Sequence, residues 1–165
     1  MKNRKRGFSL VELLIVLAVI AALIATITPV ALNAIRKSQA TKVAQNMKTL
    51  AAAIENAAYV NGYDATTGKI YKNASEEPIT IADLGRDLDS EKYGIFYTKT
   101  TDEFDVAIVT TEAVDYTTAV SVVSGLAKPP ADFSTTYGNY EDLGLDGTYG
   151  ISDIQIVYTY TFSLY

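Results

Sequence analysis

Residues 8–35 read FSLVELLIVLAVIAALIATITPVALNAI, and Glu12 is the one ionisable side chain among them. An apolar run of about 20 residues, at about 1.5 Å per residue, matches a hydrocarbon core about 30 Å thick. The stretch is therefore predicted to cross a membrane as one helix. The residues before it include no acid and four cations: Lys2, Arg4, Lys5 and Arg6. The positive-inside rule places that end in the cytoplasm and the residues after Ile35 outside.

Glu12 is a carboxylic acid inside an apolar span, and placing it there costs free energy. Insertion scales put an ionised residue at the centre of a span at about 2.5–3.5 kcal/mol, and less near the ends. Glu12 follows Phe8 by about 6 Å along a helix, so its cost is at the low end. One interpretation is a carboxyl that snorkels to the headgroups or is protonated. The other is a carboxylate that pairs with a cation in an assembly, and a cut after Gly7 would place a free amino group on Phe8 at a similar depth.

At these residues the chain resembles the type IV pilin and pseudopilin family. A basic leader ends in Lys5-Arg6-Gly7, the aromatic Phe8 follows, and the acid Glu12 stands fifth after that junction. The resemblance implies cleavage between Gly7 and Phe8 by a membrane aspartyl prepilin peptidase, with N-methylation of Phe8 by the same enzyme. It also implies that Glu12 pairs with the Phe8 amine of a neighbouring subunit.

The resemblance implies a structural role, in which identical chains form a homopolymer filament. The subunit would wait in membrane lipid as a single-pass protein of the inner membrane, with its N-terminus cytoplasmic. An assembly ATPase and an inner-membrane platform would then extract it into an extracellular or periplasmic filament. Such filaments serve adhesion, twitching, DNA uptake or protein secretion.

Two other functions are open. A pseudopilin of a type II secretion or DNA-uptake system is the alternative within the family. From another class, the chain would be a membrane-tethered extracytoplasmic binding domain that never polymerises. An enzyme is not expected, because the sequence holds no histidine, no cysteine and no nucleotide-binding or hydrolase motif.

A secretory signal peptide is the rival interpretation of the N-terminus. Leu32-Asn33-Ala34 offers a poor cleavage site for it. The apolar stretch is too long for such a signal, however, and Glu12 lies where its core would be apolar. Pilin-type processing gives a mature chain that begins at Phe8, and signal cleavage gives one that begins at Ile35.

Beyond Ile35 the helix is predicted to become amphipathic and to continue to about Val60. Apolar residues recur at steps of four and three and form one stripe: Val43, Met47, Leu50, Ile54 and Ala57. Asn61-Gly62 is a stop signal. Pro29 lacks an N–H and clashes with the preceding turn, so a kink or local melting is expected there.

The remaining residues predict a small, mostly antiparallel sheet that covers the stripe, and hence an α+β fold. Residues 94–99 and 104–109 alternate in strand fashion around a polar turn and predict a hairpin. Residues 154–164 form the clearest strand, with Ile154, Ile156, Tyr158, Tyr160, Phe162 and Leu164 on one face. The weaker predictions are a loop at 62–77 with a short strand near 69–72, a short helix or turn at 78–85, a strand or short helix at 117–123, and a loop at 125–150.

Three segments are therefore expected. Residues 1–7 form a cleaved leader, residues 8–35 a transmembrane and filament-core helix, and residues 36–165 an extracytoplasmic globular domain. Without cysteine there are no disulfides, so the C-terminal region must be held in another way.

The charge of the chain argues against binding to nucleic acid. Removal of the four leader cations takes the side-chain net charge from −5 to −9, whereas a polyanion requires a basic surface.

No cofactor or metal is expected. Asp142, Asp146 and Asp153 lie among glycines, and oxygen-rich loops can bind calcium. Their spacing does not fit the EF-hand pattern, so an ordinary turn cluster is the preferred interpretation.

Overall fold

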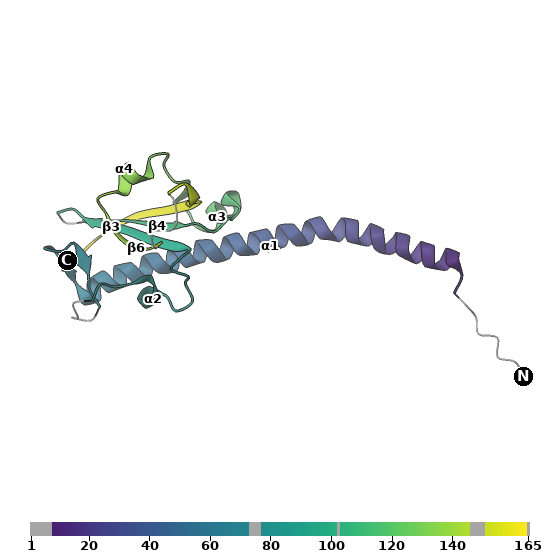
Figure 1. Cartoon of the computed structure of the whole chain (residues 1–165), viewed down its shortest axis with the longest axis horizontal. Helices are drawn as coiled ribbons and strands as arrows, with labels where there is room; N and C mark the ends of the chain where they lie inside the picture. Colours follow the sequence, from purple (N-terminus) through teal and green to yellow (C-terminus); the bar gives the residue numbers. More distant parts are fainter. Residues whose placement is uncertain (1–7, 73–76, 102, 146–150, 165) are drawn as a thin grey trace, which may run out of the picture. The chain divides into compact units, whose positions relative to one another are not determined.

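The computed structural model describes residues 8–72, 77–101, 103–145 and 151–164 (Figure 1). The chain divides into two units after Arg36, and each is described by itself. Helix α1, Leu10–Asn61, contributes to both.

The α1 helix was predicted over about residues 8–60, and its observed bounds confirm this. It ends where expected, because Gly62 adopts a φ of 78°, which a residue with a Cβ adopts only with strain. The Gly62 N–H donates to the Ala58 carbonyl at 3.0 Å, so one of the last helical carbonyls keeps a partner.

Pro29 lies inside α1 and does not interrupt it. The expected local melting is therefore absent, while a kink stays a prediction. Two hydroxyls in the preceding turn donate back to helix carbonyls, Thr26 Oγ1 to Leu23 at 2.9 Å and Thr28 Oγ1 to Ile24 at 2.8 Å. These polar side chains consequently find partners inside the helix itself.

A five-stranded sheet, antiparallel throughout, follows α1 in the order β5-β7-β4-β3-β6. The predicted hairpin is confirmed as β3, Tyr93–Lys99, and β4, Glu103–Thr110, paired along their whole length. The predicted last strand is β7, Ile156–Ser163. It lies inside the sheet, between β4 and the two-residue β5, Leu126–Ala127.

Two predicted loops contain more regular structure than expected. The loop at 125–150 holds β5, helix α4, Phe133–Tyr137, and strand β6, Glu141–Gly144, which pairs with β3. The many glycines and prolines of this segment made its short elements difficult to predict. The two strands form because neighbouring strands offer unpaired edges. The loop at 62–77 holds a two-stranded hairpin of β1, Tyr63–Asp64, and β2, Lys69–Ile70, which confirms the short strand predicted there.

The remaining elements are short helices. Residues 78–85 contain α2, Ile81–Leu84, and residues 117–123 form helix α3, Tyr116–Val122, so the helical alternative holds for both. Asp115 caps α3 by accepting from the Thr118 N–H at 2.7 Å. A 3-10 turn, Ile151–Asp153, precedes β7.

The main core lies between the second half of α1 and one face of the sheet (Figure 1). The predicted stripe is buried at Val43, Met47, Leu50 and Ile54. Ala57 is an exception, since it is half-buried and Ala58 is buried instead. The stripe meets buried side chains of three strands: Ile95, Ile108 and Ile156.

Five of the six alternating residues predicted on this strand face belong to the main core with α1, as expected: Ile156, Tyr158, Tyr160, Phe162 and Leu164. Ile154 does not, and packs in a second cluster with Val157 and Phe133. The reason is that the strand begins at Ile156, so its alternation does not extend back to Ile154. The second cluster lies on the opposite face of the sheet, where Phe96 meets Phe133 with ring centroids 5.2 Å apart.

Three tyrosine hydroxyls, two of them on fully buried side chains, connect the elements of the main core. Tyr160 donates to the Ala51 carbonyl of α1 at 2.7 Å. Tyr93 accepts from Asn46 Nδ2 of α1 at 3.1 Å, and Tyr97 accepts from the Ile70 N–H at 3.2 Å. Burial raises the pKa of Tyr93 and of Tyr97 to about 12, and it raises the pKa of Tyr160 as well.

Replacing Tyr160 by Phe should lower the free energy of unfolding of the globular unit by about 0.5–1.5 kcal/mol, because one hydrogen bond is lost while the ring is kept. Tyr158→Phe is the matched control, since Tyr158 shares the strand face and its hydroxyl makes no hydrogen bond within the described residues. Urea unfolding of the full chain in detergent, followed by near-ultraviolet circular dichroism of tyrosine, measures both. Equal losses for the two variants would contradict the assignment.

Stability should fall as pH rises from about 10 to about 12, since Tyr93 and Tyr97 ionise readily only in the unfolded state. Their folded pKa is raised, so their contribution is complete below the unfolded pKa and is lost above it. Each contributes a slope of about 1.4 kcal/mol per pH unit, and Tyr97→Phe should reduce the slope by that amount. Urea unfolding across this pH range measures it. A pH-independent stability would show that these hydroxyls ionise in the folded protein.

Candidate functional site

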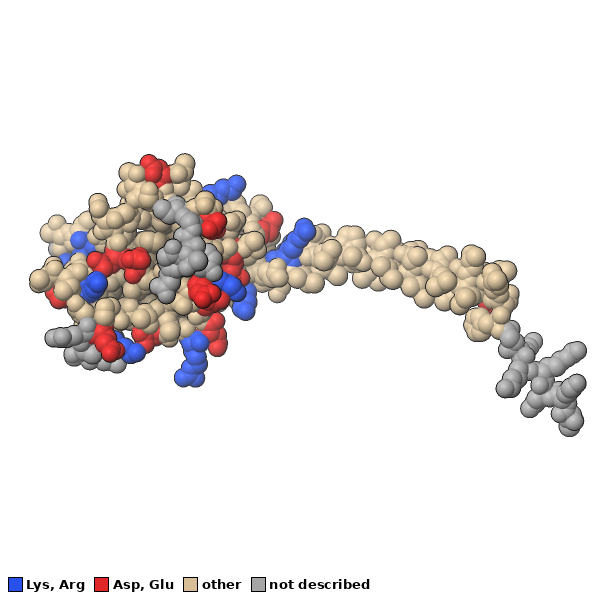
Figure 2. Space-filling model, in the orientation of Figure 1, with Lys and Arg blue, Asp and Glu red and all other residues tan. Residues whose placement is uncertain are grey.

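The first half of α1 is a helix with apolar side chains on every side. All side chains from residue 8 to residue 35 are exposed, among them Leu10 at 78 % and Val30 at 69 %. Figure 2 shows this stretch as a run without basic side chains until the first cations beyond it. A helix that is hydrophobic all round is stable only when it is surrounded by lipid or by other protein.

Among the described residues, α1 is the one helix long and apolar enough to cross a membrane. The core helix of a soluble protein can satisfy the same criteria, but its apolar window would be buried, whereas here none of that window is. An exposed apolar helix near the N-terminus fits a single membrane anchor.

Glu12 lies in the first turn of α1 and caps the N-terminal end of the helix. Its Oε2 accepts from the Ser9 backbone N–H at 3.0 Å, and the Ser9 carbonyl accepts from the Leu13 N–H at 3.2 Å. Ser9 is thus the N-cap residue and Glu12 the third helical residue, which is the Glu half of a capping box. This hydrogen bond gives the Ser9 N–H a partner at a position where lipid offers none.

Sequence reasoning missed this local partner of Glu12. The signal was present, because Ser9-Leu10-Val11-Glu12 is the Ser-x-x-Glu pattern that precedes an apolar helical run. The capping bond uses one carboxylate oxygen, and no described residue donates to the other, Oε1. Glu12 can therefore cap its own helix and still accept from a cation outside the chain.

The other predicted site residues are placed as follows. Phe8 is 80 % exposed just before α1, and Pro29 lies within the helix. Gly7 lies outside the described residues, so the Gly7–Phe8 bond stays a prediction.

The acidic residues considered for calcium are not gathered into a site by the described parts of the chain. Asp142 lies on β6 and Asp153 in the turn before β7, while Asp146 is outside the described residues. Within the residues described, no group of three potential metal ligands occurs.

The comparisons with known proteins bear on this N-terminal segment. The family model of the prokaryotic N-terminal methylation motif matches residues 2–28. No curated protein and no solved structure matches the chain. The matched residues contain the predicted leader, Phe8 and Glu12, so the resemblance stated from the sequence is confirmed over this segment. The long helix packed on an antiparallel sheet fits the pilin fold.

Proposed function

We propose that this chain, which carries the class III prepilin leader of type IV pilins and pseudopilins, is a structural subunit that polymerises into a type IV pilus filament. Before assembly it is cut between Gly7 and Phe8, and the new Phe8 amine is methylated. The observation that carries the proposal is the fully exposed apolar stretch of residues 8–35, whose single ionisable side chain, Glu12, stands one turn from that amine. In the filament, residues 8–35 of many copies form the core, and residues 36–165 form the globular exterior.

Glu12 is important for assembly because the helix must leave lipid and pack against identical helices. Lipid tails are as apolar as leucine, so the apolar side chains of residues 8–35 gain little free energy when they leave the bilayer for a bundle of helices. A carboxylate gains more, because in lipid it has no counter-ion. Pairing of Glu12 with the Phe8 amine of a neighbour therefore favours the bundle and sets the stagger between adjacent copies. Because the chain must still leave the membrane, an assembly ATPase and an inner-membrane platform supply the work.

The location of the chain follows from the same segment. The subunit first crosses the inner membrane once, with its N-terminus in the cytoplasm, where the prepilin peptidase acts on it. The four cations of the leader favour this orientation. It then becomes part of an extracellular filament. A head-to-tail interface that does not close on itself generates such a helical polymer.

A pseudopilin of a secretion or DNA-uptake system would share all of these steps and would form a short periplasmic filament. Overproduction followed by electron microscopy separates the two, since a pilin gives long surface fibres. A tethered binding domain would instead remain a monomer in the membrane.

Processing should yield a mature chain that begins at N-methylated Phe8. Mass spectrometry of the N-terminal peptide from membranes of cells with the peptidase would show loss of residues 1–7 and one added methyl group. A deletion of the peptidase is the control, and it should leave the leader attached. A mature N-terminus at Ile35 would instead identify a secretory signal peptide.

Glu12→Gln should insert into the membrane normally and yet fail to assemble, because the amide keeps an acceptor for the Ser9 N–H but cannot form an ion pair. Glu12→Ala should also insert, lose the helix cap and fail to assemble. Loss of one hydrogen bond to a charged group, about 1.5–3 kcal/mol, lowers each addition equilibrium at least about tenfold. Sheared surface filaments and membrane fractions, quantified by immunoblot, measure the two steps.

Glu55→Gln is the matched control for that experiment, since it removes an acid from the second half of α1 and should leave assembly intact. Wild-type filaments from Glu12→Gln together with none from Glu12→Ala would show that capping, and not charge pairing, is the role of Glu12. Wild-type filaments from both variants would contradict the proposal.

A further inference from the structure

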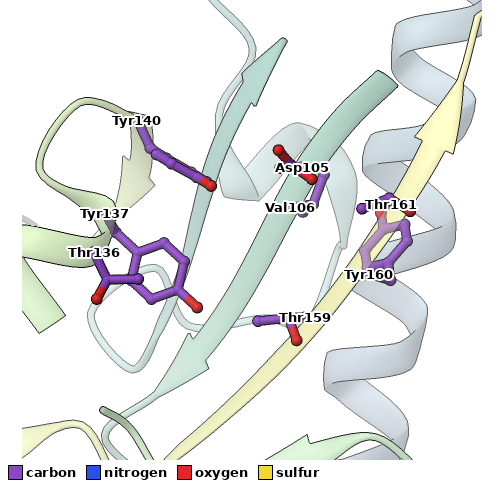
Figure 3. A pocket seen from close by; sticks show the side chains of 8 residues that line it. All are labelled: Asp105, Val106, Thr136, Tyr137, Tyr140, Thr159, Tyr160 and Thr161. Atoms are coloured by element: carbon purple, nitrogen blue, oxygen red, sulfur yellow. The ribbon is translucent and has the colours of Figure 1, made fainter. Parts of the chain in front are cut away.

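A groove of about 490 Å³ lies over the sheet face that points away from α1 (Figure 3). Strands β4 and β7 form its floor, and the segment that begins at α4 forms its wall. Its volume is in the range of small-molecule sites, about 300–1,000 Å³. Its lining residues are Asp105, Val106, Thr136, Tyr137, Tyr140, Thr159, Tyr160 and Thr161.

The floor is positioned by strand register. Asp105 on β4 is paired with Thr161 on β7, and Thr159 lies two residues away on the same face. Because side chains alternate along a strand, these three point away from the core that contains Val106 and Tyr160. They form a row of one carboxylate and two hydroxyls on two interior strands.

The wall consists of two tyrosines held by aromatic packing. The Tyr137 ring contacts Phe133 at 4.5 Å and Tyr140 at 5.2 Å between centroids, the latter edge to face. Figure 3 shows the Tyr140 hydroxyl and the Asp105 carboxylate pointing toward one another across the groove. Burial and then the Asp105 charge raise the pKa of Tyr140, so its hydroxyl stays a hydrogen-bond donor.

Two of the polar side chains that line the groove, Thr136 and Tyr160, donate to backbone carbonyls, and the other five are not used by the fold. Asp105, Tyr137, Tyr140, Thr159 and Thr161 have no side-chain hydrogen bond or ion pair within the described residues. Five tyrosines outside the groove do bond through their hydroxyls: Tyr59, Tyr71, Tyr93, Tyr97 and Tyr116. Two further tyrosines without such a bond, Tyr63 and Tyr158, have ring contacts with Phe104 and Tyr160 of the main core.

We propose that this groove binds a neutral carbohydrate. A sugar presents hydroxyls, which both donate and accept, and one apolar face of C–H groups. The groove matches both, with four free hydroxyls and one acceptor-only carboxylate for the sugar hydroxyls, and tyrosine rings for the apolar face. Sugar hydroxyls bonded to Asp105 form charge-assisted hydrogen bonds, which are about twice as strong as neutral ones.

The lining argues against other ligand classes. An anion would meet the Asp105 charge, and none of the described lysines or arginines lines the groove. A cationic side chain would donate to Asp105 and to the threonine oxygens but would accept from none of the four free hydroxyls, because an ammonium has no acceptor. If the chain forms a filament, the groove recurs on every copy, and multivalency raises the avidity of weak single sites by about 10²–10⁴.

The test uses the full mature chain in detergent micelles, applied to an array of neutral oligosaccharides of glucose, galactose and N-acetylglucosamine. Binding to members of this array is expected, with a dissociation constant about tenfold weaker for Asp105→Asn, which removes the charge from its hydrogen bonds, and about two- to tenfold weaker for Tyr140→Phe, which removes one neutral hydrogen bond. Asp87→Asn and Tyr63→Phe are matched controls outside the groove and should bind as the unmodified chain does. Circular dichroism of all four variants confirms that each is folded.

Three outcomes would overturn the proposal. They are no binding to any neutral oligosaccharide, binding that both groove variants retain, and binding of oligolysine that Asp105→Asn abolishes, which would make the groove a cation site. Because the measurement is made on monomers in micelles, its result does not depend on filament formation. Failure to polymerise would leave the carbohydrate site standing, and failure to bind sugar would leave the filament proposal standing.

Discussion

A polypeptide in hydrocarbon must satisfy its backbone hydrogen bonds from within, and this constraint governs the first half of α1. The helix satisfies this constraint along residues 10–35, and a side chain supplies a hydrogen bond at the end where backbone partners are missing. At its start, where N–H groups lack partners, the Glu12 carboxylate accepts from Ser9. Before Pro29, the hydroxyls of Thr26 and Thr28 donate to the Leu23 and Ile24 carbonyls, so these polar side chains also find partners within the helix. The group that makes this span costly in lipid is thus also the group that completes its first turn.

The second half of α1 lies in a different environment, because the sheet covers one apolar stripe and the other faces of the helix are exposed to solvent. Met47 and Leu50 are fully buried there, and apolar burial of this kind is worth about 1.5–3 kcal/mol for each large side chain. In a chain without cysteine, the C-terminal strand is held by its interior place in the sheet and by the Tyr160 bond to Ala51. Cross-strand pairing on both sides of β7 thus holds this strand in place without a disulfide.

Much of the fold could be predicted from the sequence where a pattern was long. The helix, the hairpin and β7 each carry enough periodic residues to define one buried face, as at Val43, Met47 and Leu50. The short elements were not predicted, because their stability comes from neighbouring strands. Strand β6, for example, is held by its pairing with β3. At the site, Glu12 was recognised as costly, but its bond to Ser9 was overlooked although the pattern was visible. The groove proposed to bind sugar could not be predicted from the sequence, because Asp105, Tyr140 and Thr161 come together only through strand register and loop placement.

The interior position of β7 has a consequence for biogenesis. It is the last strand of the described chain, yet the β4 edge pairs with it along all eight of its residues. Until β7 has been added, β4 therefore has an open edge, and the α1 stripe lacks the part of its cover that β7 supplies. An open edge of this kind recruits strands from other molecules. Correct folding accordingly depends on β7 reaching β4 before a strand of another incomplete chain does, and crowding of incomplete chains favours swapped or aggregated molecules.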